Sequence, residues 1–194
     1  MVRGRRSTAA AYSRQVRSPQ TLSEADRRLV ADWAADCAER VLGLFEAEAP
    51  ADDRPRAAIA RTRAYARGEL NTADEIRRRF EGGVPAGEVK VPAAAAAARA
   101  AGQAVAVSHM GAHALGAAAY AVQAAGLASP DRPEAVAEEI RWQLTHMTAE
   151  VQAALRALPP VGQNPSGPLG PGLLASGQLG AIVRELQAAI SVGV

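Results

Sequence analysis

Apolar side chains recur every three or four residues along most of this 194-residue chain, a pattern that predicts amphipathic helices. The first helix is expected to begin at Ser23, because Ser23 and Asp26 have the spacing of a capping box, and to end before Pro50. Its expected buried positions are Leu29, Val30, Trp33, Cys37, Val41, Leu44 and Phe45. Two shorter helices are predicted next, over residues 55–68 and from residue 71 or 72 to the Gly82-Gly83 pair.

The alanine-rich segment that opens at Pro92 is too long to form one helix in a domain of this size. A helix from Pro92 to Leu127 would span roughly 50 Å at 1.5 Å per residue. We therefore expect a break between Ser108 and Gly111 and a helix on either side of it. The glycines expected to let helix axes approach closely are Gly102, Gly111 and Gly116.

The C-terminal third predicts two more helices separated by an irregular segment. One helix begins at Pro133 and extends through Leu155; the other carries Leu179, Ile182, Val183, Leu186 and Ile190. The Pro- and Gly-rich stretch before the last helix cannot be regular structure. That last helix could pack on its own bundle or reach a second subunit, as the docking arm of a helper protein.

These elements predict an all-α fold, a single bundle of about six or seven helices. Its expected parts are a disordered basic tail (1–21), a helical bundle domain (22–158), a Pro/Gly-rich linker (159–172) and a C-terminal amphipathic helix (173–194). Alanine dominates the 48% of hydrophobic residues and only 4% are aromatic, which favours helices over sheets. The single cysteine, Cys37, excludes an internal disulfide and a cysteine-based zinc site.

The basic character of the chain lies in its N-terminal tail. Five arginines precede the first acidic residue, Glu24, and removing them from the formal net charge of +2 leaves −3 for the rest. We therefore do not expect a nucleic-acid partner. The tail lacks the apolar run of a signal peptide, and alanine is too weakly apolar to span a bilayer, so we expect a cytoplasmic protein without a membrane partner.

Two adjacent carboxylates, Asp52 and Asp53, are the first candidate for chemistry. One interpretation is structural, because carboxylates before a helix accept its free N–H groups. The other is catalytic: Arg54 and Arg56 would keep the carboxylates ionised, one of them would take a proton from an amine, and an arginine would hold an anionic group.

The histidines His109 and His113 are the second candidate, because their spacing of four would put both on one helical face. We expect no metal here, since a third ligand and the catalytic Glu of a zincin are missing. Buried imidazoles could instead hydrogen-bond across the bundle, or His113 and Tyr120 could line a polar pocket left open by small residues. Trp142, four residues before His146, forms a comparable pair.

Three stretches of the chain carry a resemblance to a known family. They are residues 32–59, which include Asp52-Asp53-Arg54-Pro55-Arg56; residues 108–121, which include Ser108-His109-Met110-Gly111-Ala112-His113; and Ile140-Arg141-Trp142-Gln143-Leu144. Over about residues 22–158 the chain resembles small helical Imm-5-like immunity proteins, some of which are labelled SbcC-type exonucleases. The resemblance implies an all-α fold and a protein that neutralises a toxin by tight binding.

A second similarity, to small helical proteins that assist ring closure in antibiotic biosynthesis, implies a small-molecule enzyme. The hypothesis it favours is a cofactor-free cyclase of the aziridine-forming type, with Asp52, Asp53 and His113 as catalytic residues. Its substrate-binding residues would be Arg54, Arg56, His109, Tyr120 and Trp142. Such an enzyme would bind a small-molecule substrate and form a homo-oligomer or a heterodimer with a small related subunit. The alternative hypothesis is the immunity protein with its toxin partner.

Overall fold

The structure is a computed structural model and describes residues 18–78 and 83–192. After a short 3-10 helix, η1 (Pro19–Thr21), eight α-helices follow within these residues, and no strand occurs among them. They are α1 (Glu24–Glu48), α2 (Arg54–Ala66), α3 (Thr72–Arg77), α4 (Pro92–Ala106), α5 (His113–Ala128), α6 (Glu134–Thr145), α7 (Ala149–Arg156) and α8 (Gly177–Val192). The predicted all-α bundle is confirmed.

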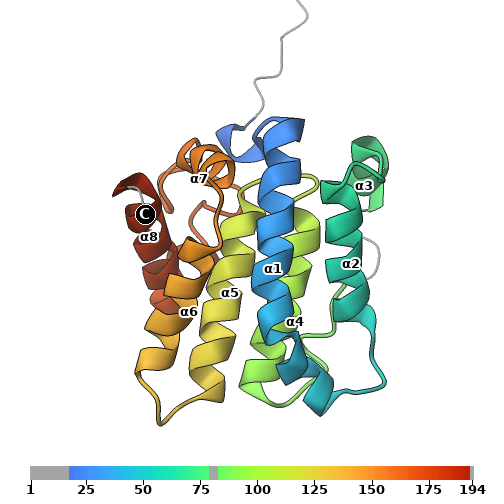
Figure 1. The fold of residues 1–194 in the computed structure, drawn as a ribbon, viewed down its shortest axis with the longest axis vertical. Coiled ribbons are helices and arrows are strands. Elements are labelled where there is room, and N and C mark those ends of the chain that lie inside the picture. The colour runs from blue at the N-terminus through green and yellow to red at the C-terminus, as the bar shows by residue number, and fades with distance from the viewer. Residues whose placement is uncertain (1–17, 79–82, 193–194) are drawn as a thin grey trace, which may run out of the picture.

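Helices α4 and α5 pair at the centre of the bundle and the others pack around them. In Figure 1, α1 lies in front of α4 and α5, with α2 and α3 on one side and α6, α7 and α8 on the other. Helix α1 contacts both central helices, α2 contacts α1 and α4, and both α6 and α8 contact α5. No helix in the described part of the chain combines the length and hydropathy needed to cross a membrane.

The two central helices bury small side chains almost exclusively. Every buried residue of α4 is an alanine, and α5 buries alanines together with Leu115, Gly116, Tyr120 and Val122. Larger core side chains come from the surrounding helices, among them Trp33 and Phe45 of α1 and Tyr65 of α2. Of the three glycines predicted to bring helices together, Gly116 does so, since it lies against Gln103 of α4. Gly102 and Gly111 instead make room for Val84 and Leu22.

Helix ends follow the capping signals in most places. Ser23 Oγ accepts a hydrogen bond from the Asp26 backbone N–H at 3.1 Å, which confirms the predicted start of α1. The break between α4 and α5 is also confirmed, and the carbonyl groups of Gln20 and Thr21 accept hydrogen bonds from the N–H groups of Ala112 and Gly111 there. The expected end of the third helix at Gly82 lies outside the described residues.

Two expectations about helices were wrong. The helix beginning at Pro133 does not continue through Leu155, because Thr148 caps a new helix: its Oγ1 accepts from the Val151 N–H at 3.3 Å. Leu29 was expected in the core but is 40% exposed, since its edge of α1 borders a groove beside α7 rather than the central pair.

The segment over residues 159–172 contains no helix and folds back on the bundle. Gln20, 1% exposed, fixes it from the other end of the chain: its Nε2 donates to Ser166 O at 2.6 Å and its Oε1 accepts from Leu169 N at 2.9 Å. Helix α8 then buries its predicted apolar positions against α5, α6 and α7. Of the two alternatives for this helix, packing on its own bundle is the one observed.

Gly116 offers a test of the close packing between α4 and α5. An added Cβ would stand 2.3 Å from Gln103 Oε1 and 2.9 Å from Leu174 Cδ1. We expect Gly116→Ala to lower the free energy of unfolding by about 1–3 kcal/mol, the typical range for an overpacked core. Urea denaturation measures the change.

The matched control is Gly43→Ala, at an exposed position of α1 where an added Cβ meets nothing within 4 Å. Because glycine is a poor helix former, this change should raise stability by about 0.5–1 kcal/mol. Equal effects of the two substitutions would contradict the packing argument.

Candidate functional site

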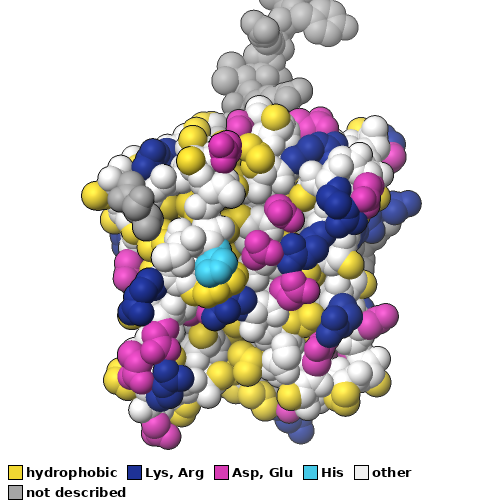
Figure 2. Space-filling view, viewed as in Figure 1, with side chains coloured by type: hydrophobic (Ala, Val, Ile, Leu, Met, Phe, Trp, Pro, Cys, Tyr) yellow, Lys and Arg dark blue, Asp and Glu magenta, His cyan; other side chains and the backbone are white. Residues whose placement is uncertain are grey.

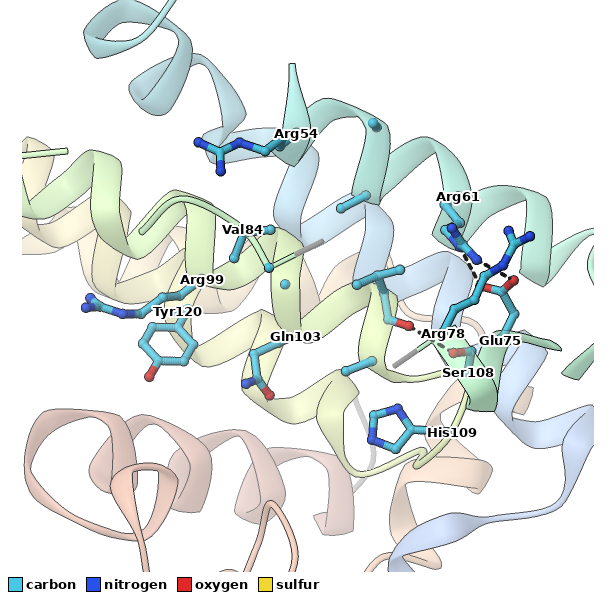
Figure 3. A pocket seen from close by; sticks show the side chains of 16 residues that line it. Arg54, Arg61, Glu75, Arg78, Val84, Arg99, Gln103, Ser108, His109 and Tyr120 are labelled. Carbon is cyan, nitrogen blue, oxygen red and sulfur yellow. Dashed lines mark hydrogen bonds and ion pairs between the residues drawn. The ribbon is translucent and has the colours of Figure 1, made fainter. Parts of the chain in front are cut away.

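A pocket of about 600 Å³ lies beside the central pair, between α2, α3, α4 and α5 (Figure 3). Its walls are apolar where small side chains leave space, and the residues that form them are Ala57, Ala58, Val84, Val105 and Ala106. Polar side chains occupy both ends. A volume of this size suits a small organic molecule.

One end of the pocket holds a buried ion pair. Arg61 of α2 donates to Glu75 of α3 through two hydrogen bonds, Nε to Oε2 at 2.6 Å and Nη2 to Oε1 at 2.8 Å. The Glu75 side chain is only 5% exposed, so this bidentate arrangement compensates a charge that water cannot reach. Arg78 and Ser108 lie at the same end (Figure 3).

The other end is formed by Arg99 and Gln103 of α4 and Tyr120 of α5 (Figure 3). Arg99 and Gln103 are four residues apart and therefore share one face of α4. The Arg99 guanidinium carbon lies 6.0 Å from the centre of the Tyr120 ring. This end is rich in hydrogen-bond donors, and none of the described residues that form it is a carboxylate.

The two histidines stand side by side despite the break between α4 and α5. His109 lies in the connection and lines the pocket, while His113 is the first residue of α5; their ring centres are 4.9 Å apart. His113 Nδ1 is 2.8 Å from Gln103 Oε1. Burial, with a smaller contribution from His109, lowers the pKa of His113 to about 3. The ring is therefore neutral at pH 7, and its Nδ1–H donates to the amide oxygen, which can only accept.

Asp52 and Asp53 lie at the start of α2 and do not line the pocket. Asp52 accepts from the backbone N–H of Arg54 at 3.1 Å and from its guanidinium at 2.6 Å, and these bonds lower the pKa of Asp52. Arg54 also pairs with Glu88 at 2.7 Å. Asp52 therefore has the structural role of the first interpretation, whereas the exposed Asp53 makes no side-chain capping bond.

The other predicted substrate-binding residues are dispersed. Arg54, His109 and Tyr120 line the pocket. Arg56 instead pairs with Glu46 at 2.6 Å, and Trp142 lies on the surface of α6. The structure thus brings together three of the predicted residues and leaves the carboxylates, Arg56 and Trp142 elsewhere. Among the described residues no group of three or more His, Cys, Asp or Glu side chains could hold a metal ion.

Sequence reasoning missed most of the polar residues of the pocket: Arg61, Glu75, Arg78, Arg99, Gln103 and Ser108. One signal was available, since Arg99 and Gln103 interrupt the alanine-rich helix at a spacing of four. The pairing of Arg61 with Glu75 joins two helices and has no signature in the sequence.

The sequence model of one protein family, described as "Imm-5 like putative immunity protein", matches residues 20–150. The chain belongs to this family. No curated protein and no solved structure gives a significant match. The region shared with the Imm-5-like family runs from η1 into α7 and contains the whole pocket as well as Trp142, while α8 lies beyond it.

The low pKa of His113 predicts a pH dependence of folding. In the unfolded chain this histidine has its ordinary pKa of about 6.5. Between that pH and about pH 3 the unfolded state therefore binds a proton that the folded state does not bind. The contribution of His113 to the free energy of unfolding is therefore fully present above about pH 6.5. It falls toward pH 3, by up to about 1.4 kcal/mol per pH unit. We expect His113→Gln to remove this contribution.

Urea denaturation of both proteins between pH 5 and pH 7.5 measures the difference, with His146→Gln as the control that removes an exposed histidine. Stability curves of wild type and His113→Gln that run parallel over this range would show that His113 is not held neutral by the fold.

Proposed function

We propose that this Imm-5-like protein neutralises a toxin by binding it tightly as a protein partner. The observation that carries the proposal is the family match, which covers residues 20–150 and so all of α1 to α6. A rigid helical bundle suits this role, because a surface that is already ordered loses little conformational entropy on binding.

The surface residue best suited to anchor the toxin is Trp142. Its partly exposed ring stacks between the Arg40 guanidinium, 3.9 Å from the ring centre, and the His146 ring, 4.0 Å away. Arg40 is fixed in turn by Glu139, whose side chain is 5% exposed. Tryptophan and arginine dominate the binding energy of many protein interfaces, and here both are held in place before a partner arrives.

Charged side chains of both signs surround this anchor. Asp32, Asp36 and Glu39 of α1 pair with the guanidinium of Arg63, and Arg28 and Arg67 line the same groove as Asp32 and Asp36. Acidic and basic side chains are interspersed over the face shown in Figure 2. A toxin surface with the complementary pattern of charges would associate faster and be selected over other partners.

The enzyme hypothesis has less support. A general base works best with a pKa near the working pH, whereas Arg54 lowers the pKa of Asp52 and burial lowers that of His113. The catalytic roles of Asp52, Asp53 and His113, the ring-closing reaction and the self-association that we expected of an enzyme therefore stay predictions.

The proposal predicts a toxin gene beside the gene of this protein, and the product of that gene provides the test. Co-expression with the protein should restore growth of a toxin-sensitive host, and the two purified proteins should form a stoichiometric complex. We expect Trp142→Ala to weaken that complex about thirtyfold, since a central aromatic anchor contributes about 2 kcal/mol or more. Calorimetric titration measures the dissociation constant.

The matched control is Leu173→Ala, which truncates an apolar side chain that is 74% exposed and far along the chain from α6. It should leave the dissociation constant unchanged, and thermal melting should show that both variants fold. Undiminished toxin activity in the presence of excess protein would overturn the proposed function. If Trp142→Ala still protects the host from the toxin, only the role of Trp142 as an anchor is contradicted.

A further inference from the structure

Three side chains at one end of the pocket carry donors that no described residue engages. The Arg99 guanidinium forms no ion pair within the described chain, and its carbon lies 6.0 Å from the centre of the Tyr120 ring. The Tyr120 hydroxyl makes no hydrogen bond within the same residues, although Tyr120 is only 6% exposed. The amide Nε2 of Gln103 is likewise unpartnered there, because the Gln103 bond to His113 uses Oε1. Arg99 is exposed and Gln103 is half-buried, so water reaches these donors, and an acceptor that enters the pocket can take its place.

The three donors come from the two central helices, and the contacts of Gln103 fix its position. Gln103 is oriented by His113 Nδ1 and lies in the space that Gly116 leaves open, where a Cβ would stand 2.3 Å from its Oε1. Arg99 is one helical turn before Gln103 on α4. Tyr120 comes one turn after Gly116 on α5. A ligand at this end would therefore meet donors from two helices that pack against each other.

The charges of the described residues around the pocket favour an anion. Four arginines among them line it against one carboxylate, that of Glu75, which is already bound to Arg61. Asp52 and Glu88 lie nearby but are bound to Arg54. Neither of these two carboxylates lines the pocket, and within residues 18–78 and 83–192 no acidic residue lies at the Arg99 end.

The walls between the two ends require an apolar ligand body. Ala57 and Ala58 of α2 and Val105 and Ala106 of α4 line this part of the pocket together with Val84. A bare inorganic ion would leave these walls in contact with water, whereas an apolar group of a few hundred daltons would fill the volume of about 600 Å³.

We propose that this pocket binds an amphipathic organic anion, with its oxyanion head on Arg99, Gln103 and Tyr120 and its apolar body along the alanine walls (Figure 3). Arg99 neutralises the head and donates to it, and the neutral donors of Gln103 and Tyr120 complete its coordination. The site does not depend on toxin binding, since Trp142 lies outside it.

The test uses one apolar body with three head groups: 2-naphthoate, 2-naphthyl phosphate and 2-naphthylmethylammonium. Calorimetric titration of the full chain should show binding of an anion at least tenfold tighter than that of the ammonium compound. We expect Arg99→Gln to weaken anion binding about tenfold and Tyr120→Phe about fivefold, the losses typical of one charged and one neutral hydrogen bond. The tighter of the two anions identifies the head group as carboxylate or phosphate.

The matched control is Arg141→Gln, which removes an exposed arginine of α6 that does not line the pocket and should not change affinity. Thermal melting confirms that each variant folds, and Trp142→Ala should retain anion binding while it loses toxin binding. The proposal is overturned if neither anion binds, if the ammonium compound binds as tightly, or if Arg99→Gln and Tyr120→Phe both leave the affinity unchanged.

Discussion

The structure depends on the direct contact of α4 and α5 through alanine. Because an alanine side chain ends at Cβ, the two axes can approach closely, and ordering these residues costs no side-chain entropy. Alanines alone bury little area, so the surrounding helices must supply the large side chains, such as Phe45 and Trp33. The small size of alanine also creates the pocket: where α2 presents alanines as well, at Ala57 and Ala58, no side chain of the described residues fills the space between the helices.

Much of this architecture could be predicted from local signals. Ser23 predicted the start of α1, and the length of the alanine-rich segment required a break before α5. The split between α6 and α7 was missed because the apolar periodicity continues through it. The signal that begins α7 is a single hydrogen bond, in which Thr148 Oγ1 accepts from the Val151 N–H. The exposure of Leu29 could not be predicted either, since periodicity identifies the apolar face of a helix but not how much of that face other helices cover.

The candidate site was less predictable, because its contacts join residues distant in sequence. Arg61 and Glu75 meet across two helices, and Gln103 meets His113 only because the chain turns between α4 and α5. Asp52 and Asp53 were predicted as catalytic residues because they are adjacent carboxylates. The Arg54 guanidinium, however, donates hydrogen bonds to both carboxylate oxygens of Asp52, and these local bonds account for the occurrence of Asp52 beside Arg54. Adjacent charges of opposite sign are therefore weaker indicators of chemistry than polar residues isolated in an apolar helix, such as Arg99.

The pocket and the Trp142 surface lie on different helices that meet at α5. Helix α6, which carries Trp142, reaches α5 through Gln143, whose Nε2 donates to Ala118 O at 3.2 Å, and Tyr120 extends from the same segment of α5. Coupling between two sites requires an element with two alternative arrangements. The alanine side chains offer none, since they have no rotamers to exchange. An anion in the pocket and a toxin on Trp142 should therefore bind independently, so a loss at one site cannot be ascribed to damage at the other.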